Sequence, residues 1–338
     1  MIEVGIVGAS CYTGAELLRL CAGHPDLEVR VATGDSMAGT RAAELYPSLA
    51  AAYPRLRFTG YDPVELTGLD LVFLGLPHGA SQAIVPDLLG TVEHLVDLAA
   101  DFRLQDPALY PQWYGEPHTA PDLLAQFAYG LPELFRDQIK AASHVATPGC
   151  YPTAASLALA PLVRAGAVAT TGIIVDAASG VSGAGRPPKP TNTFCAVDED
   201  FTAYGILDHR HTPEMEQVLG ASVLFTPHLA PMSRGILATC YARPTGATST
   251  DALLELLQTA YADEPFVVVL DGSPSTKATL GSNAVHVTAR YDERTGTVLA
   301  IAALDNLTKG ASGAAVQCAN LLLGLPETAG LPAVGVYP

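Results

Sequence analysis

Three observations predict a two-domain α/β fold for this chain. Strand-like and helix-like segments alternate in the first third, which is typical of a parallel sheet with crossover helices. A glycine-rich turn, from Gly5 to Gly14, follows the first of these strands. Beyond Gly166 the pattern becomes rich in strands, as in a mixed α+β domain. We therefore expect a Rossmann-type, doubly wound domain followed by an α+β domain.

The elements of the first domain follow from short apolar runs and the helical spacing between them. A compact run opens the chain, and the run that ends near residue 76 is apolar enough to be a strand buried on both faces. The alanine and leucine spacing after Gly149 is helical, with Pro152 tolerated in the first turn. We expect strands at 2–7, 28–32, 69–76 and 94–98, another ending at 145–146, and helices at 14–22, 79–89 and 151–164.

The second half yields more strands than helices. A last helix follows a strand and is free to pack back on the first domain, and the proline-rich stretch 186–190 is interpreted as a shaped loop. The predicted domains are 1–149, completed by about 306–338, and 150–305. We expect strands at 172–178, 222–226, 236–242, 266–270, 284–291 and 297–304, and helices at 213–219, 251–262 and 310–323.

Composition excludes several classes of protein. The 338 residues are 49% hydrophobic and 15% charged, which indicates a globular chain. A formal net charge of −16 argues against nucleic acid and against anionic membrane surfaces as partners. We expect no secretory signal and no membrane span. Six scattered cysteines without a CxxC pair suit reduced thiols in the cytoplasm.

The glycine-rich turn is the first candidate site. Its glycines let backbone amides and a helix N-terminus approach a pyrophosphate. The turn alone is also consistent with an ordinary tight connection, but its position after an N-terminal strand favours a dinucleotide. The candidate cofactor-binding residues here are Gly8, Ser10, Cys11, Tyr12, Thr13 and Gly14.

The end of the second strand bears on the choice of cofactor. The acidic residue that would hold a ribose 2′-hydroxyl is not clearly placed there. Thr33 and Ser36 occupy the region, with Arg41 nearby, and this favours a 2′-phosphate and hence NADP(H). Asp35, an acidic residue in the same region, instead favours a ribose 2′-hydroxyl and hence NAD(H).

Cys150 is the strongest candidate for chemistry. It stands in Pro148-Gly149-Cys150, where a strand ends and a helix begins. Amide groups and the helix dipole at such a point favour a thiolate, the nucleophile that acyl transfer needs. Most cysteines are small buried apolar groups, and we expect this for the other five.

A nucleophilic cysteine needs a proton partner, and the segment His209-Arg210-His211 is the densest polar cluster. We interpret His209 as the acid/base and His211 as an orienting or substrate-binding neighbour, although the sequence does not separate the two well. A metal site is the other interpretation, but no carboxylate or cysteine lies at a convincing ligand spacing. We expect no metal.

Glycine-rich loops and arginines complete the set of candidates. The loop from Ser179 to Arg186 combines flexible backbone, hydroxyls and a guanidinium, which suits an anionic ligand. An amide after the strand at 297–304 is placed to hold a nicotinamide carboxamide, or it belongs to a simple turn. The predicted cofactor contacts are Ser179, Gly180 and Asn306, and the predicted substrate contacts are Arg103, Ser182, Arg186, His211 and Arg234.

Long motifs in a fixed order carry a resemblance to a known family. They include GIVGASCYTGAELLRL, FLGLPHG, DLAADFRL, YGLPEL, TPGCYPTAA, SGVSGAGR, YGILDHRHTPE, FTPHLAPMSRGIL and ALDNLTKGASGAAVQCAN. With these motifs the chain resembles the N-acetyl-γ-glutamyl-phosphate reductase family over essentially its whole length. One residue departs from the family pattern, because Cys11 replaces the glycine of GASGYTG. A side chain there is expected to crowd the pyrophosphate or to shift the turn.

The resemblance implies an NADP-binding domain joined to a glyceraldehyde-3-phosphate dehydrogenase-like catalytic domain, in a homo-oligomer (a dimer or a tetramer). It implies that Cys150 attacks the γ-acyl phosphate of N-acetylglutamate, that phosphate leaves, and that NADPH reduces the thioester to the semialdehyde. His209 would be the acid/base, and the SGVSGAGR loop and Arg234 would surround substrate and nicotinamide. This is the third step of arginine biosynthesis.

Other functions remain open from the sequence. Reduction of aspartyl phosphate, or of an aminoadipyl phosphate on an acidic carrier protein, uses the same chemistry, although a charge of −16 disfavours an acidic carrier. A non-catalytic NADP-binding regulator has no need of Cys150 and His209. A cysteine hydrolase without nucleotide is disfavoured by the N-terminal strand and helix pattern.

Overall fold

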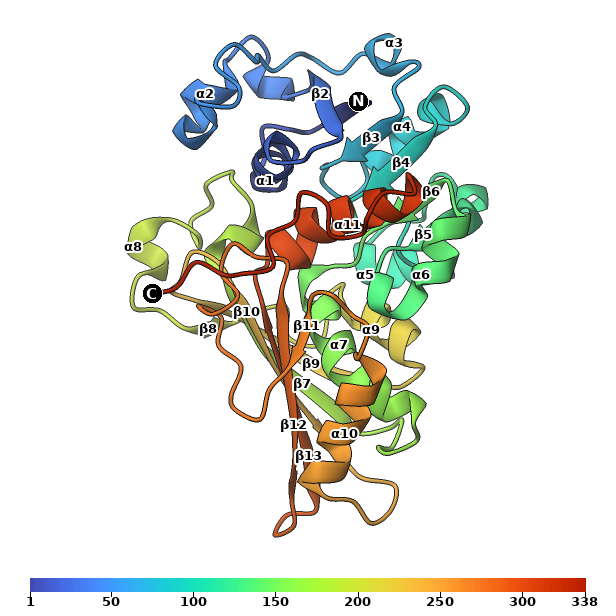
Figure 1. The fold of residues 1–338 in the computed structure, drawn as a ribbon, viewed down its shortest axis with the longest axis vertical. Helices are drawn as coiled ribbons and strands as arrows, with labels where there is room; N and C mark the ends of the chain where they lie inside the picture. Colours follow the sequence, from blue (N-terminus) through green and yellow to red (C-terminus); the bar gives the residue numbers. More distant parts are fainter. The chain divides into compact units, whose positions relative to one another are not determined.

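The computed structural model describes residues 1–338, and the chain divides into two compact units (Figure 1). The first unit contains residues 1–148 and 311–331, and the second contains residues 149–310 and 332–338. The sequence analysis assigned about 306–338 to the first domain, whereas residues 332–338 lie in the second unit. There the Asn283 N–H donates to the Pro332 carbonyl at 2.7 Å, which ties the end of the chain to that unit.

Six parallel strands form the sheet of the first unit, in the order β2-β1-β3-β4-β6-β5. All four residues of β3 (Leu71–Leu74) are buried, as expected of a parallel strand covered on both faces. Helix α11 (Gly313–Leu322), from the end of the sequence, packs against α1, α6 and β4 of this unit. Helix α11 was predicted to pack on the first domain, and it does so because it is apolar and buried along almost its whole length.

The order of strands creates a topological switch point in the first unit. β1 (Ile2–Val7) lies between β2 and β3, so the connections that follow β1 and β3 diverge at the carboxyl edge of the sheet. Open α/β sheets bind ligands at such a switch point. Gly8 directly follows β1 and Gly75 directly follows β3, which places the glycine turn at this switch point.

The remaining elements of the first unit surround this sheet. They are α1 (Tyr12–Ala22), β2 (Leu27–Ala32), α2 (Ala42–Leu45), α3 (Pro63–Leu66), α4 (Ser81–Leu88), β4 (His94–Asp97), α5 (Leu109–Tyr114), β5 (Phe127–Tyr129), α6 (Pro132–Ala141) and β6 (His144–Ala146).

Seven strands form a mixed sheet in the second unit, in the order β11-β12-β13-β10-β7-β9-β8. Helices α7, α9 and α10 pack against its strands, and Figure 1 shows α7 and α10 alongside them. Residues alternate along β7 (Ile173–Gly180), where Ile173, Val175 and Ala177 are buried. Ile174, Leu224 and Tyr241 on β7, β9 and β10 are large apolar residues that are exposed. The sheet therefore buries one side of its strands and leaves apolar groups on the other.

The other elements of the second unit follow the prediction closely in number and order. They are α7 (Cys150–Arg164), α8 (Phe194–Val197), β8 (Thr202–Ala203), α9 (Thr212–Leu219), β9 (Val223–Ala230), β10 (Ile236–Ala242), α10 (Thr250–Ala260), β11 (Val267–Val269), β12 (Val285–Asp292) and β13 (Thr297–Leu304).

The predicted fold class is confirmed, and the differences are local. The short strands β5 and β8 were not predicted, because two or three residues are too few to show a pattern. The ten-residue helix α6 was not predicted either. The predicted last helix at 310–323 begins instead as a π-helical turn, Thr308–Ser312, before α11. In this wide turn Gly310 lies so close to Cys150 that a side chain at 310 would come within 2.8 Å of the Cys150 Cβ.

Candidate active site

Cys150 is the first residue of α7, at the free end of a long helix. Gly149 is its N-cap residue, with an extended backbone (φ −66°, ψ 152°). Because the first N–H groups of a helix have no partner within it, this end favours an anion and hence a thiolate. Cys150 is half-buried, whereas Cys21 is fully buried and its burial raises the pKa of that thiol to about 12. Cys150 is thus open to a ligand and Cys21 is inert.

Gly149 is held from two sides by residues of the second unit. Its N–H donates to Oε1 of Glu214 at 2.7 Å, and Glu214 is completely buried. A side chain at position 149 would come within 2.5 Å of Nε2 of His211, so the imidazole packs directly on the glycine backbone. A side chain at position 149 would displace His211, and these contacts hold the backbone immediately before Cys150.

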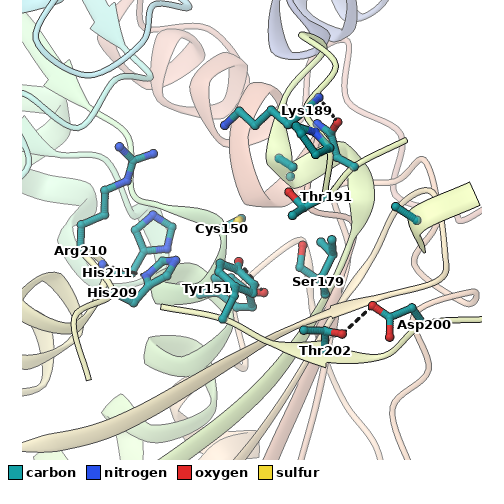
Figure 2. Close-up of a pocket in the computed structure, with 17 residues that line it drawn as sticks. Cys150, Tyr151, Ser179, Lys189, Thr191, Asp200, Thr202, His209, Arg210 and His211 are labelled. Carbon is teal, nitrogen blue, oxygen red and sulfur yellow. Dashed lines mark hydrogen bonds between the residues drawn. The ribbon is translucent and has the colours of Figure 1, made fainter. Parts of the chain in front are cut away.

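A cavity of about 550 Å³ opens beside Cys150, and all the residues that line it belong to the second unit. This is a size suited to a small metabolite. Figure 2 shows Cys150 in the middle of the cavity, with His209, Arg210 and His211 on one side and Ser179 and Thr202 on the other. The lining comes from the start of α7 (Cys150 and Tyr151), Ser179 on β7, the loop 189–192, Tyr204 and the segment 209–211.

His209 lies among aromatic rings. Its ring centroid is 5.5 Å from that of Tyr204, 5.2 Å from Phe225 and 4.7 Å from His211, all in edge-to-face arrangements. Burial, together with the positive charge of Arg210, lowers the pKa of His209 to about 4, and Asp208 opposes the shift. The ring is therefore neutral at pH 7.

One hydrogen bond defines which nitrogen of His209 carries the proton. The backbone N–H of His211 donates to Nδ1 of His209 at 3.2 Å. A backbone N–H can only donate, so Nδ1 holds the lone pair and the neutral ring carries its hydrogen on Nε2. His209 thus offers an N–H donor at neutral pH, whereas it was interpreted from the sequence as the acid/base.

Two tyrosines complete this wall of the cavity. The Tyr204 hydroxyl donates to the Tyr151 hydroxyl at 3.1 Å, and the Tyr151 hydroxyl donates to the His228 carbonyl at 3.0 Å. Burial raises the pKa of Tyr204 to about 12, so both hydroxyls stay protonated at neutral pH. The sequence analysis did not identify either tyrosine.

The loop from Ser179 to Arg186 borders the cavity in part. Ser179 and Gly183 line it, whereas Arg186 does not. Gly180 packs against the Arg234 backbone, where a side chain would come within 2.7 Å of the Arg234 nitrogen. Nδ2 of Asn306 donates to the Ser182 hydroxyl at 2.9 Å, and its Oδ1 accepts the Gly235 N–H at 2.7 Å. In this structure Asn306 therefore holds two loops together.

Arg234 is engaged by a buried carboxylate. Asp305 is completely buried, and its Oδ1 accepts hydrogen bonds from Nε and Nη2 of Arg234 at 3.1 and 2.9 Å. The same oxygen accepts the N–H groups of Leu307 and Thr308, and Oδ2 accepts the N–H of Gly281 at 2.7 Å. Arg234 does not line the cavity around Cys150, and its contact with substrate stays a prediction.

The glycine turn of the first unit fits a dinucleotide. Gly8 has φ +83°, and a side chain there would come within 2.4 Å of the Gly75 carbonyl oxygen. Gly14 packs equally closely on the backbone of Ala9. The N-terminus of the 11-residue helix α1 follows directly, so the turn combines close backbone approach with free N–H groups. This is the arrangement that a pyrophosphate requires.

Cys11 occupies its unusual position without strain. Its backbone is extended (φ −85°, ψ 174°), a conformation open to any residue. Its sulfur accepts the Gly14 N–H at 3.3 Å and contacts the Thr13 hydroxyl at 3.0 Å. Cys11 therefore acts as the N-cap of α1, and the turn keeps its shape without the glycine.

The other predicted cofactor and substrate contacts of the first unit differ in exposure. Thr33 is buried, and its hydroxyl accepts the Gly8 N–H at 3.1 Å, so it supports the glycine turn. Ser10 donates to the Gly34 carbonyl, while Ser36 is exposed. Arg103 is buried and donates to the carbonyls of Thr147 and Leu98, both at 2.8 Å. Arg103 thus satisfies backbone oxygens within its own unit.

The chain contains no cluster of three or more histidine, cysteine, aspartate or glutamate side chains arranged to hold a metal ion. None of its helices combines the length and the hydropathy needed to cross a membrane.

The cavity contains residues that the sequence analysis missed. Besides the two tyrosines these are Lys189, Thr191, Asn192 and Arg210. Arg210 lies between the two predicted histidines, so its neighbours were the available signal. Lys189 stands in the proline-rich stretch that was interpreted only as a shaped loop.

Comparison with known proteins matches each unit to a domain family. The model of the semialdehyde dehydrogenase NAD binding domain matches residues 3–142, and that of the semialdehyde dehydrogenase dimerisation domain matches residues 150–306. Solved structures share the fold: aspartate semialdehyde dehydrogenase II of Vibrio cholerae in complex with ASA has a TM-score of 0.70 at 16% identity, covering 96% of this chain and 98% of that one. Aspartate semialdehyde dehydrogenase of Candida albicans with NADP has a TM-score of 0.70 at 14% identity, with 96% and 99% covered.

Curated sequences are much more similar. N-acetyl-gamma-glutamyl-phosphate reductase of Symbiobacterium thermophilum is 50% identical over 100% of this chain and 99% of its own length. The proteins of the same name from Geotalea daltonii and Geobacter sulfurreducens are 47% and 46% identical, with 100% of both chains covered in each case. The resemblance seen in the sequence is confirmed, and the chain, an oxidoreductase that binds a nicotinamide dinucleotide, belongs to the N-acetyl-γ-glutamyl-phosphate reductase family.

Proposed function

We propose that this chain reduces N-acetyl-γ-glutamyl phosphate to N-acetylglutamate 5-semialdehyde and phosphate with NADPH, through a thioester on Cys150. The observation that carries the proposal is Cys150 at the N-terminus of α7, beside a cavity that also contains His209. The names of relatives at 45–50% identity supply the substrate, and the family resemblance implies a place in arginine biosynthesis.

The residues of the second unit account for acyl transfer. The Cys150 sulfur attacks the γ-acyl carbon, and the carbonyl electron pair moves to oxygen, which accepts a hydrogen bond from Nε2–H of His209. When the C=O bond re-forms, the bond from carbon to the phosphate oxygen breaks, and phosphate leaves and takes up a proton from water. A fixed N–H donor in a buried site stabilises such an oxyanion more than water does. Covalent catalysis thus divides one difficult step into two.

The nicotinamide, when bound, supplies the hydride that reduces the thioester. Collapse of the resulting thiohemiacetal re-forms a C=O bond, breaks the C–S bond and returns the thiolate to Cys150. His209 is again placed to donate a hydrogen bond to the oxygen. Gly8, Ser10, Cys11, Tyr12, Thr13 and Gly14, with Ser179, Gly180 and Asn306, are the proposed cofactor contacts.

NADP is proposed over NAD. Arg41 and Arg57 form an isolated antiparallel bridge close to the end of β2, near the exposed Ser36. Arg41 pairs with Glu44 at 2.6 Å, but both side chains are about half exposed, so the pair is weak and can exchange for a phosphate. Replacement of Arg41 by methionine should lower the preference for NADPH over NADH, measured as the ratio of the two kcat/KM values.

The direct test follows the reverse reaction. N-acetylglutamate semialdehyde, phosphate and NADP are mixed with wild type and with Cys150→Ala, and NADPH formation is recorded by absorbance. We expect turnover in the wild type and none in the variant. Turnover that survives in Cys150→Ala would contradict the thioester. Turnover only with aspartate semialdehyde would transfer the proposal to the related acyl phosphate.

We also propose a homo-oligomer in the cytoplasm. The exposed apolar residues Ile174, Leu224 and Tyr241 lie on neighbouring strands, and the matching family model describes a dimerisation domain. All six cysteines are free, which suits a reducing compartment. Light scattering of wild type and Leu224→Asp tests the assembly: a wild-type mass above one chain that falls in the variant supports it, and a wild-type monomer contradicts it.

A further inference from the structure

The cavity beside Cys150 concentrates positive charge in an acidic protein. The whole chain has a formal net charge of −16, yet Lys189 and Arg210 both line this cavity and neither forms an ion pair. The one carboxylate in the lining, Asp200, accepts a hydrogen bond from the Thr202 hydroxyl. Two cations without ion-pair partners in a ligand cavity point to anionic groups on the ligand.

Two of the three arginines expected to bind these anions are occupied elsewhere, and the third, Arg186, does not line the cavity. Arg234 is held by the buried Asp305, and Arg103 donates to backbone carbonyls within the first unit. Removing Arg234 from its buried partner would leave an uncompensated charge, which is costly. No such cost applies to Lys189 and Arg210, which are exposed at the cavity.

We propose that Arg210 binds the phosphate of the acyl phosphate and that Lys189 binds the carboxylate at the other end of the substrate. This inference rests on the proposed function, whose substrate carries these two anionic groups. Arg210 is the neighbour of His209 in the chain, and both residues line the cavity that contains Cys150. A planar guanidinium also suits a phosphate, which it can bind with two parallel hydrogen bonds.

Electrostatic effects within the cavity support the position of Arg210. Its charge contributes to the lowered pKa of His209, after burial, and it opposes the raised pKa of Tyr204. His209 and Tyr204 lie in edge-to-face contact beside Cys150 in the same lining. The guanidinium is therefore near enough to both side chains for its charge to act where the leaving group departs.

Lys189 is held in place by a short local structure. Its backbone N–H donates to Oδ1 of Asn192 at 2.5 Å, and Nδ2 of Asn192 donates to the Pro187 carbonyl at 3.2 Å. Prolines on both sides of Lys189 restrict the backbone further. In Figure 2 the Lys189 side chain extends from this loop toward the side on which Arg210 lies. A substrate between the two cations would keep its reactive carbon at Cys150.

The first experiment needs no turnover and so separates this inference from the proposed function. Iodoacetate and iodoacetamide both alkylate Cys150, but only iodoacetate is an anion. Mass spectrometry of the Cys150 peptide gives the two rates, free of modification at Cys11 and Cys195. We expect Arg210→Met and Lys189→Met each to lower the ratio of iodoacetate to iodoacetamide rates at least threefold. Arg294→Met, which removes a distant exposed charge, is the control and should leave the ratio unchanged.

The second experiment assigns each cation to its anion in the reverse reaction. Arg210→Met should raise the KM of phosphate about tenfold, the loss expected for one charge-assisted hydrogen bond, and change the KM of the semialdehyde much less. Lys189→Met should do the opposite, and Arg210→Lys should recover part of the phosphate affinity. Unchanged alkylation ratios and unchanged KM values would overturn the inference. If the wild type shows no turnover, while Arg210→Met and Lys189→Met still lower the alkylation ratio as expected, the proposed function is overturned instead.

Discussion

The backbone N–H of His211 donates to Nδ1 of His209, so the residue two positions later fixes the proton of the imidazole on Nε2. The ring faces aromatic neighbours and is neutral at pH 7, because burial and Arg210 lower its pKa to about 4. At neutral pH His209 is therefore suited to donate a hydrogen bond to an oxyanion rather than to accept the thiol proton.

The donor role predicts different effects for two substitutions of His209. His209→Ala should lower kcat by about 10²- to 10³-fold, the usual cost of losing one oxyanion donor. His209→Gln keeps an N–H donor but cannot exchange a proton near pH 7. Because the amide can still donate to the oxyanion, this variant should retain at least about ten times the kcat of the alanine variant. Steady-state rates of semialdehyde oxidation measure both. Equal loss in the two variants would mean that the ring must transfer a proton.

The protonation state of His209 can be observed directly. With ¹⁵N-labelled histidine, NMR should report a neutral ring with hydrogen on Nε2 from pH 8 down to about pH 5, because the pKa of His209 is lowered to about 4. Comparison with His209→Gln assigns the signal. A ring that becomes charged between pH 6 and 7 would contradict the prediction.

Asp305 should be among the most important polar residues for the stability of the second unit. Its carboxylate accepts hydrogen bonds from Arg234 and from three backbone N–H groups. Asp305→Ala should lower the free energy of unfolding by about 3 kcal/mol or more, since it leaves buried groups and a charge without a partner. Urea titration measures the loss, with Asp263→Ala as an exposed control. A loss below about 1 kcal/mol would show that Arg234 and the turn find other partners.

Asp97 should make the stability of the first unit depend on pH. It is completely buried, and burial raises its pKa to about 7, with the charge of Asp101 adding to the shift and hydrogen bonds from Ala99 and Ser81 opposing it. Between about pH 4 and 7 the folded state then binds more protons at this site than the unfolded state, so stability falls as pH rises through that window. Asp97→Asn should flatten this slope.

Chemical denaturation of the Asp97→Asn variant at several pH values measures the change. Asp137→Asn, an exposed change in the same unit, is the matched control and should keep the wild-type slope. If Asp97→Asn destabilises the protein equally at every pH, the carboxyl is charged throughout and its hydrogen bonds outweigh its burial.

The sequence predicted the elements whose signal is local. The strand before Gly8, the turn before Cys150 and the helix after it depend on neighbouring residues, and the structure contains all three. The roles of Arg234 and Asn306 depend instead on partners 71 residues apart or more, which no local pattern reveals. Lys189 and Arg210 stand in irregular segments without periodicity, so only the folded cavity brings them together.

The cavity around Cys150 is lined by the second unit alone, and the glycine turn belongs to the first. The proposed acyl site and the proposed pyrophosphate site thus lie in separate stretches of the chain. A change of acyl substrate along an evolutionary lineage can therefore occur in the cavity lining without a change to the dinucleotide turn. The acyl preference of the enzyme should thus be open to redesign in the second unit while the glycine turn of the first unit is left unchanged.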